Sequence, residues 1–432
     1  MTEAREVPAS SSGGIYFGWR VVAALFLCML ALFGVAIFSF IILTAPMAAE
    51  FGWSAAQSGM LVSAMYLVAP LALLAGPVTA RIPPWRLIFT GLLVQAAAMA
   101  LLGHVSDIGQ LYALRVFMGF GKVMTASAAP IIVARWFSRR FATAVAFVWA
   151  GGSAGGFVMS PLTEALANAL GWRDAALAIA GIVVLLTLAA GLLARGTASP
   201  AALGLGLDGD PLLPGDRQDR HREDSPRAGH RVTIAPGVAL LMVLAVITAG
   251  MTSLGTFAHQ PTFLRAAGLS AEVAATVLGL TAAGSLIGSA TIGLALDRFP
   301  GWCCGLFVAA SVYVGLASLY LVLKTPSVPL AVIGAIFMGY AFGAGEVMWI
   351  TFTKREFGEA AFPVTYGGFY FALQVGYALG GGVAGWGLES FGSLGFLAML
   401  AFFYAPPLLV SLFIRAARMP VAARDGSARI GS

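Results

Sequence analysis

The sequence is short of charged residues. Its 25 basic and 19 acidic residues make up 10% of the chain, whereas a soluble globular protein carries about 25%. Apolar residue types occupy 59% of the 432 positions, and another 53 residues are glycine. Too few polar side chains are left to cover a water-soluble particle, which argues against a soluble enzyme and a disordered chain. We therefore predict a polytopic membrane protein that lies in a lipid bilayer.

Residues typical of disulfide frameworks, metal centres and nucleotide sites are also scarce. The three cysteines are interpreted as small apolar side chains, and the four histidines form no H-E-x-x-H motif. The sequence has no C-x-x-C pair, no G-x-x-x-x-G-K-[ST] loop and no signal-peptide pattern at its start. We expect no cofactor, no metal and no enzymatic activity. We expect no nucleic-acid partner either, because the net charge of +6 comes from residues scattered between apolar runs.

Apolar runs long enough to cross a bilayer recur along the chain. A spanning helix needs about 20 mostly apolar residues. Charged and turn residues separate twelve such runs, of which the fourth is the least regular because it contains Arg115 and Lys122. We predict an all-α membrane protein with twelve spans at about 20–45, 55–80, 87–105, 111–134, 142–165, 175–194, 236–260, 272–296, 304–323, 328–352, 364–388 and 393–414.

The basic residues are distributed unevenly between the two sides that these spans define. Twenty of the 25 fall on the side of the N-terminus, three fall on the other side and two lie inside span 4. Basic residues accumulate on the cytoplasmic side of membrane proteins, so we expect both termini to face the cytoplasm. Arginine exceeds lysine by 22 to three, which fits a GC-rich genome and a bacterial inner membrane.

One long polar segment divides the chain into two groups of six spans. It is rich in proline and glycine and contains a charged run at 216–224. This composition favours a mobile tether with short helical turns over a regulatory element. We expect a cytoplasmic tail at 1–19, six-helix bundles at 20–194 and 236–414, a cytoplasmic linker at 195–235 and a cytoplasmic tail at 415–432.

The two halves repeat the same motifs in register. Gly76-x-x-x-Ala80-Arg81 ends span 2, and Gly293-x-x-x-Asp297-Arg298 ends span 8 at an offset of 217. The triplet Phe-Met-Gly at 117–119 in span 4 recurs at 337–339 in span 10. Matches at a nearly constant offset indicate duplication of a six-helix unit. Pseudo-symmetric halves of this kind are typical of secondary transporters, with the substrate site between them.

These motifs resemble those of the major facilitator superfamily. Its loop motif G-x-x-x-D-R-x-G is matched by residues 293–298, whereas the first copy has Ala80 and Pro83 at the Asp and the last Gly. Arg115-x-x-x-Gly119-x-Gly121 in span 4 is similar to the family pattern R-x-x-x-G-x-G. The resemblance implies alternating access around a central cavity that spans 1, 4, 7 and 10 line.

A narrower resemblance is to bacterial proteins related to the monocarboxylate transporters. Short aromatic and glycine motifs carry it, at 16–20, 50–54, 136–140, 171–173 and 345–346. The chain departs from that group in span 8, which has no charged residue between Glu272 at its outer end and Asp297, whereas characterised monocarboxylate transporters have an Asp and an Arg there. The resemblance implies a small organic anion as substrate.

Three ionisable residues stand out inside the predicted spans: Arg115, Lys122 and Glu346. Such residues normally face a bundle interior or water, because exposure to lipid costs at least about 2.5–3.5 kcal/mol. Arg115 and Lys122 are seven residues apart and share a helix face, so we interpret both as binding an anionic substrate. Arg115 as a packing donor is the alternative. Glu346 is interpreted as the proton-coupling carboxylate, or else as a partner of a cytoplasmic arginine.

Further polar residues complete the predicted site and gate. Thr252 in span 7 and Gln374 and Tyr377 in span 11 are candidates for binding substrate oxygens, as is Tyr370. The resemblance implies that Asp297 meets the start of span 5 near 141–143 when the inner gate closes, and that the gate includes Arg298 and Arg81.

Together these features predict a monomeric secondary transporter. Its substrate is a small organic anion, a monocarboxylate by resemblance. Because the sequence has no nucleotide-binding motif, we expect an ion gradient or substrate exchange to drive transport, with proton symport as the favoured mode. An exporter of drugs or metabolites, an uptake carrier for a larger compound such as a siderophore, and a sensor without transport are the alternatives.

Overall fold

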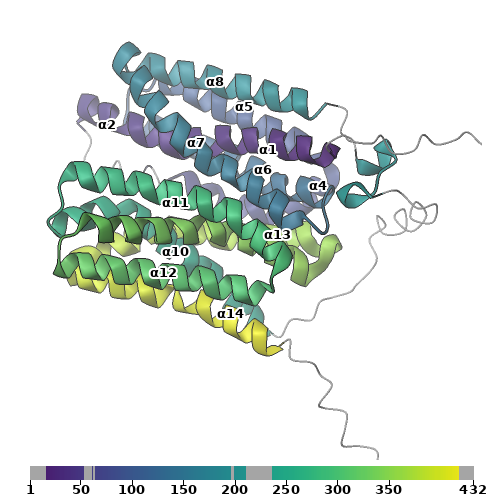
Figure 1. Ribbon diagram of the computed structural model, residues 1–432. Helices are drawn as coiled ribbons and strands as arrows, with labels where there is room; N and C mark the ends of the chain where they lie inside the picture. The colour runs from purple at the N-terminus through teal and green to yellow at the C-terminus, as the bar shows by residue number, and fades with distance from the viewer. Residues whose placement is uncertain (1–15, 53–60, 62–63, 196–198, 211–235, 418–432) are drawn as a thin grey trace, which may run out of the picture.

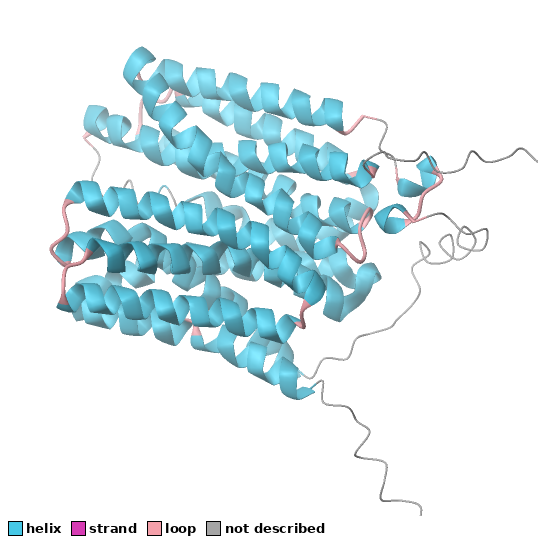
Figure 2. Cartoon of the chain, in the orientation of Figure 1, coloured by secondary structure: helices cyan, strands magenta, loops and turns pink. Residues whose placement is uncertain are grey.

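The computed structural model describes residues 16–52, 61, 64–195, 199–210 and 236–417, and all regular structure in these ranges is helical (Figure 2). The all-α fold class is therefore confirmed. The first half contains α1 (Phe17–Phe33), η1 (Gly34–Ser39), α2 (Phe40–Phe51), η2 (Met65–Leu74), α4 (Ala75–Arg81), α5 (Pro84–Leu102), α6 (Ile108–Ala134), α7 (Phe141–Leu170) and α8 (Trp172–Leu193). The second half contains α10 (Pro236–Ala266), α11 (Ala271–Arg298), α12 (Gly301–Lys324), α13 (Val328–Phe403) and α14 (Ala405–Ala417).

The helix boundaries follow local chemistry. Asp107 begins α6 by accepting hydrogen bonds from the N–H groups of Gly109 (2.7 Å) and Gln110 (3.1 Å), and Ser270 caps α11 in the same way. The long helix α13 is broken at Gly358 (φ 77°) and Gly392 (φ 67°), where a positive φ favours glycine. We refer to residues 328–357, 359–391 and 393–403 as its first, second and third segments.

The spans agree with the predicted pattern. In the described residues nine helices are long and apolar enough to cross a membrane, with Val328–Leu412 counted as one, and Met65–Arg81 is a shorter apolar helix. The two breaks in α13 lie between the predicted spans 10, 11 and 12. The described helices are thus compatible with twelve spans. The predicted boundaries of tails and linker stay a prediction, because residues 1–15, 211–235 and 418–432 lie outside the described part of the chain.

The helices form two bundles that lie side by side (Figure 1). Helices α1 to α8 make the upper bundle of the figure, and α10 to α14 make the lower one. Across the interface α7 packs against α11, and η2 and α4 pack against α13. We call the end that carries the loop 136–140 and the described linker residues 199–210 the linker end, which lies at the right of Figure 1.

The repeated glycines occupy matched positions in the packing. Gly76 of α4 contacts the backbone of Val364 in the second segment of α13, and Gly293 of α11 contacts the Ala142 carbonyl in α7. Any side chain at either glycine would clash with the opposite bundle. The sequence repeat is therefore also a repeat of close contacts between the bundles, as expected for duplicated halves.

Two motifs noted in the sequence meet at the opposite end of the molecule. The Glu50 carboxylate accepts hydrogen bonds from the Trp172 indole (2.7 Å) and from both terminal nitrogens of Arg173 (2.7 and 2.8 Å). These hydrogen bonds, chiefly those from Arg173, lower the pKa of Glu50 below its usual value. The contact joins α2 to α8 within the first bundle.

The first part of the linker is docked on the first bundle. The Asp208 carboxylate accepts hydrogen bonds from the backbone N–H groups of residues 138–140 (2.9–3.2 Å), and the Asp208 N–H donates to the Trp136 carbonyl (3.0 Å). Its side chain is 5% exposed, and its φ of 58° is rare outside glycine. The expectation of a mobile tether is wrong for residues 199–210, because Asp208 satisfies backbone groups at the start of α7.

Neighbouring side chains strengthen this contact. Arg139 pairs with Asp210 at 2.7 Å, and both side chains are exposed. The Tyr16 hydroxyl donates to the Trp136 carbonyl (3.0 Å) and packs against Gly209. Burial, together with the charge of Asp208, raises the pKa of Tyr16 to about 12, so the hydroxyl keeps its proton at physiological pH. We call this arrangement of residues 199–210 on the loop 136–140 the linker clasp.

The linker clasp makes a prediction about stability. Asp208→Ala should lower the free energy of unfolding by about 1–3 kcal/mol, because three backbone N–H groups lose their acceptor. Asp210→Ala should cost less than about 1 kcal/mol, because its ion pair is exposed. Asp208→Asn should fall between them, since asparagine tolerates a positive φ and keeps one acceptor. Equal losses for Asp208→Ala and Asp210→Ala, measured by denaturant unfolding in detergent, would contradict this account.

Candidate functional site

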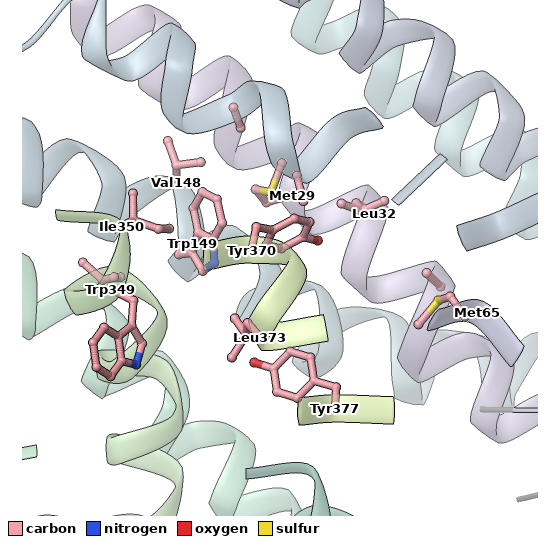
Figure 3. Packing of buried hydrophobic residues seen from close by; sticks show 14 of the residues in the cluster. Met29, Leu32, Met65, Val148, Trp149, Trp349, Ile350, Tyr370, Leu373 and Tyr377 are labelled. Carbon is pink, nitrogen blue, oxygen red and sulfur yellow. The ribbon is translucent and has the colours of Figure 1, made fainter. Parts of the chain in front are cut away.

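A small cavity lies between the two bundles. The first bundle contributes one residue each from α1, α6 and α7, and the second contributes one from α10 and nine from α13. Figure 3 shows Trp149 of α7 beside Tyr370 of α13, with Tyr377 further along the same helix. The lining residues of this central cavity are Phe33, Lys122, Trp149, Val246, Glu346, Trp349, Ile350, Tyr366, Phe369, Tyr370, Leu373, Gln374 and Tyr377.

Lys122 is the basic residue of the central cavity. Its side chain is 2% exposed, and its ammonium donates to the Gln374 amide oxygen at 3.4 Å. The same nitrogen lies 4.4 Å from the ring centroid of Tyr66 and 5.8 Å from that of Tyr377. Lys122 belongs to the first bundle, whereas Gln374 and Tyr377 belong to the second. The buried cation therefore links the two bundles through its hydrogen bond to Gln374 and its cation–π contact with Tyr377.

Glu346 faces the same cavity from the first segment of α13. It accepts a hydrogen bond of 2.5 Å from the Tyr377 hydroxyl and another from the Trp149 indole. Glu346 and Lys122 are both described, and they line one cavity without forming a direct ion pair. None of the described ion pairs joins Glu346 to an arginine, which removes the structural alternative left open by the sequence. Tyr377 lies between the two charges, since it contacts both.

Arg115 does not line the central cavity. Its guanidinium donates to the carbonyls of Ala36 (2.8 Å) and Leu61 (3.1 Å) and lies 3.8 Å from the Phe40 ring centroid. It is 1% exposed, and both carbonyls and the ring belong to the first bundle. The expected pair of substrate-binding cations is corrected to Lys122 alone. Arg115 is a packing donor, which was the alternative interpretation.

Thr252 also lies away from the central cavity. It lines a second, smaller cavity within the second bundle, together with Ser253, Thr256 and Thr281. The Thr252 hydroxyl donates to the Thr248 carbonyl (3.0 Å), as is common for threonine inside a helix. The prediction that Thr252 contacts substrate in the central cavity is therefore wrong, whereas Gln374 and Tyr377 do line that cavity.

Asp297 joins the bundles at the linker end. Its Oδ2 accepts hydrogen bonds from the backbone N–H (3.0 Å) and the hydroxyl (2.6 Å) of Thr143, in the first turn of α7. Its Oδ1 lies 3.5 Å from a guanidinium nitrogen of Arg355. A carboxylate at a helix N-terminus is favoured by free N–H groups and by the helix dipole. This contact is the one that the family resemblance implied, and its role in gating stays a prediction.

The two arginines predicted for the gate make no such contact. Arg81 and Arg298 are both exposed, and none of the described ion pairs includes either of them. The first bundle has Ala80 where the second has Asp297, so the two halves close differently. The described contacts at the linker end support the prediction that Asp297 acts in the gate. They do not support the same prediction for Arg81 or Arg298.

Lys354 makes a contact between the bundles that the sequence did not predict. It is 7% exposed, donates to the Phe137 carbonyl (2.8 Å) and lies 3.1 Å from a Glu359 oxygen. Phe137 belongs to the loop of the linker clasp, so Lys354 ties the second bundle to that loop. The charge pattern counts Lys354 only as a cytoplasmic residue, and nothing in its sequence neighbourhood signals burial.

The architecture and the cavity define a membrane transporter with two related halves around a central site. The model of the Major Facilitator Superfamily matches residues 24–381, and the chain belongs to this family. The solved structure of the proton:xylose symporter XylE bound to 6-bromo-6-deoxy-D-glucose superposes with a TM-score of 0.74 at 14% identity, over 93% of this chain and 95% of that one. At this identity the superposition shows the shared fold alone.

The chain is also similar in sequence to monocarboxylate transporters. Monocarboxylate transporter 12 of Rattus norvegicus is 25% identical over 425 residues, which cover 91% of this chain and 84% of the relative. Monocarboxylate transporter 13 of Bos taurus is 25% identical over 340 residues, with 78% and 74% covered. The predicted superfamily is confirmed by the family model, and these relatives are mammalian proteins, whereas the motifs had indicated bacterial ones.

The contact between Asp297 and Thr143 makes a prediction about the linker end. Asp297→Asn removes the negative charge from the start of α7, so that this contact should open more often. Backbone N–H groups in the first turn of α7 should then exchange with deuterium several-fold faster. Mass spectrometry of the peptide that contains Thr143 measures this rate. Arg298→Gln, an adjacent change at an exposed position, should leave it unchanged, and equal exchange in all three proteins would count against the gate.

Proposed function

We propose that this protein carries a small organic anion, a monocarboxylate, together with a proton. The observation that carries the proposal is the pairing of one buried cation and one carboxylate in a cavity between two bundles. Lys122 supplies the positive charge from the first bundle, and Glu346 supplies the carboxylate from the second. The similarity to monocarboxylate transporters supports the substrate class.

Charge balance couples the binding of the anion to the binding of a proton. With Lys122 and Glu346 both ionised the empty cavity is neutral, and an arriving anion would leave one negative charge uncompensated. Uncompensated charge is costly inside a membrane. A proton on Glu346 restores neutrality, so anion and proton are favoured to bind together and to leave together. After release the neutral pair lets the empty transporter reorient, and transport becomes symport.

The binding groups lie on opposite bundles, which suits alternating access. A substrate carboxylate at Lys122 would replace the Gln374 oxygen as acceptor and remain within reach of the Gln374 amide and the Tyr377 hydroxyl. It would therefore contact both bundles at once. Loss of the proton from Glu346 would weaken the binding of the substrate carboxylate, because two carboxylates would then compete for the ammonium of Lys122.

The orientation is also part of the proposal. The tally of basic residues supports a cytoplasmic location for the linker end and both termini. A bacterial inner membrane as the host belongs to the same proposal. On this orientation the contacts of Asp297 and Lys354 close the cytoplasmic side. A monomer contains every group that the proposal uses.

A substitution at Lys122 tests the anion site. In proteoliposomes Lys122→Gln should reduce monocarboxylate uptake at least about tenfold, because the glutamine amide cannot replace the charge. Arg115→Gln is the matched control: it should lower the unfolding temperature, since it orphans two buried carbonyls, while Lys122→Gln should not. Unchanged KM and rate in Lys122→Gln would refute the anion site.

A substitution at Glu346 tests proton coupling. Glu346→Gln mimics the protonated carboxyl, so exchange of labelled for unlabelled substrate should continue while a pH gradient no longer drives accumulation. Glu389→Gln, an exposed change on the same helix, should retain full accumulation. The measurement is uptake into proteoliposomes with and without an imposed pH gradient. Accumulation by Glu346→Gln at the wild-type level would remove the proposed proton role.

A further inference from the structure

The walls of the central cavity are mostly aromatic. Besides Lys122, Glu346 and Gln374, its lining consists of three aliphatic residues and seven aromatic ones. The aromatic residues come from both bundles and are Phe33, Trp149, Trp349, Tyr366, Phe369, Tyr370 and Tyr377. An acid of two or three carbons would use the charged groups and leave most of this surface without a partner. Aromatic side chains instead favour stacked or edge-to-face contact with another ring.

The polar groups of α13 are arranged along the cavity. Tyr370, Gln374 and Tyr377 are four and three residues apart, so they lie on successive turns of one helix face. Lys122 contacts the turns of Gln374 and Tyr377, which fixes the position of a substrate carboxylate. The turn of Tyr370 lies about 6 Å further along the helix axis. This separation is comparable to the length of one six-membered ring, which would lie between a carboxylate at Lys122 and a substituent at the Tyr370 turn.

The Tyr370 hydroxyl is buried and has no hydrogen-bond partner among the described residues. The other two tyrosines of the cavity are satisfied, because Tyr366 donates to the Ala126 carbonyl (3.2 Å) and Tyr377 donates to Glu346. Buried hydroxyl groups in proteins are nearly always paired, and an unpaired one indicates a missing partner. Tyr370 lines the cavity, so a molecule bound in the cavity can supply this partner.

We propose that the substrate is an aromatic monocarboxylate with a second polar group on its ring. This inference rests on the proposed function and narrows it. Lys122 and Gln374 bind the carboxylate, the aromatic side chains contact the ring, and Tyr370 forms a hydrogen bond with the ring substituent. Tyr370 is thus a specificity-determining residue. An organic cation held by Glu346 is the opposite assignment for the same cavity.

A matched series of ligands tests the inference. Acetate, phenylacetate and 4-hydroxyphenylacetate share one carboxymethyl group and differ in the ring and its hydroxyl, and 2-phenylethylammonium keeps the ring but reverses the charge. Binding to the purified full-length protein is measured by calorimetry. Phenylacetate should bind at least about tenfold more tightly than acetate, because it buries a ring. 4-Hydroxyphenylacetate should bind several-fold more tightly still.

A variant isolates the role of Tyr370. In Tyr370→Phe the ratio of affinities for 4-hydroxyphenylacetate and phenylacetate should fall to about one. Tyr313→Phe is the matched control, since Tyr313 lies on α12 outside the central cavity, and it should keep the wild-type ratio. A wild-type ratio in Tyr370→Phe would overturn the assignment of Tyr370.

The remaining outcomes separate the inference from the proposed function. Equal affinity for acetate and phenylacetate would overturn the aromatic substrate class and leave anion transport in place. Binding of 2-phenylethylammonium without binding of any carboxylate would overturn both, because the cavity would then select cations through Glu346.

Discussion

The structure depends on how one buried ammonium is compensated. Lys122 lies in an apolar membrane protein, at the boundary between two halves that must move relative to each other. Its partners are a neutral amide, aromatic rings and, at the far side of Tyr377, a carboxylate that does not touch it. Partial compensation of this kind leaves the cation available to an anion, whereas a direct ion pair with Glu346 would occupy it. The separation of these two charges is therefore what the proposed binding of an anion in the cavity depends on.

Contacts at the linker end hold the two bundles together on one side of this central site. At the linker end, Asp297 and Lys354 cross from the second bundle to the first and bind backbone groups at or just before the start of α7. Contacts to backbone groups do not depend on a particular side chain in the partner, and they can form and break without exposing an unpaired charge to lipid. Gly76 and Gly293 bring the bundles close enough for these contacts to form.

Much of the fold could be predicted from the sequence, because span length, glycine breaks and repeated motifs act locally. The contact of Asp297 with α7 was implied by the resemblance of residues 293–298 to a family motif. The site was predicted only in part. Spacing places Arg115 and Lys122 on one face, but Arg115 binds the Ala36 carbonyl in the π-helical segment η1, a local irregularity that no sequence pattern signals.

The remaining differences have similar causes. Thr252 and Gln374 look alike as polar residues in apolar helices, and only the rotation of each helix decides which of them faces the cavity. Lys354 is buried because the loop 136–140 covers it, and that loop is distant in sequence. The aromatic walls were overlooked because rings are common in membrane helices, so their convergence on one cavity becomes visible only in three dimensions.

The loop 136–140 is held from two directions. Asp208 binds it from the linker, and Lys354 binds it from the second bundle at Phe137. A soluble protein that bound the linker, or a covalent modification of the linker, would therefore act on the same loop that Lys354 of the second bundle contacts. The proposed transport would then respond to binding or modification in the aqueous phase, and no ligand would have to enter the bilayer.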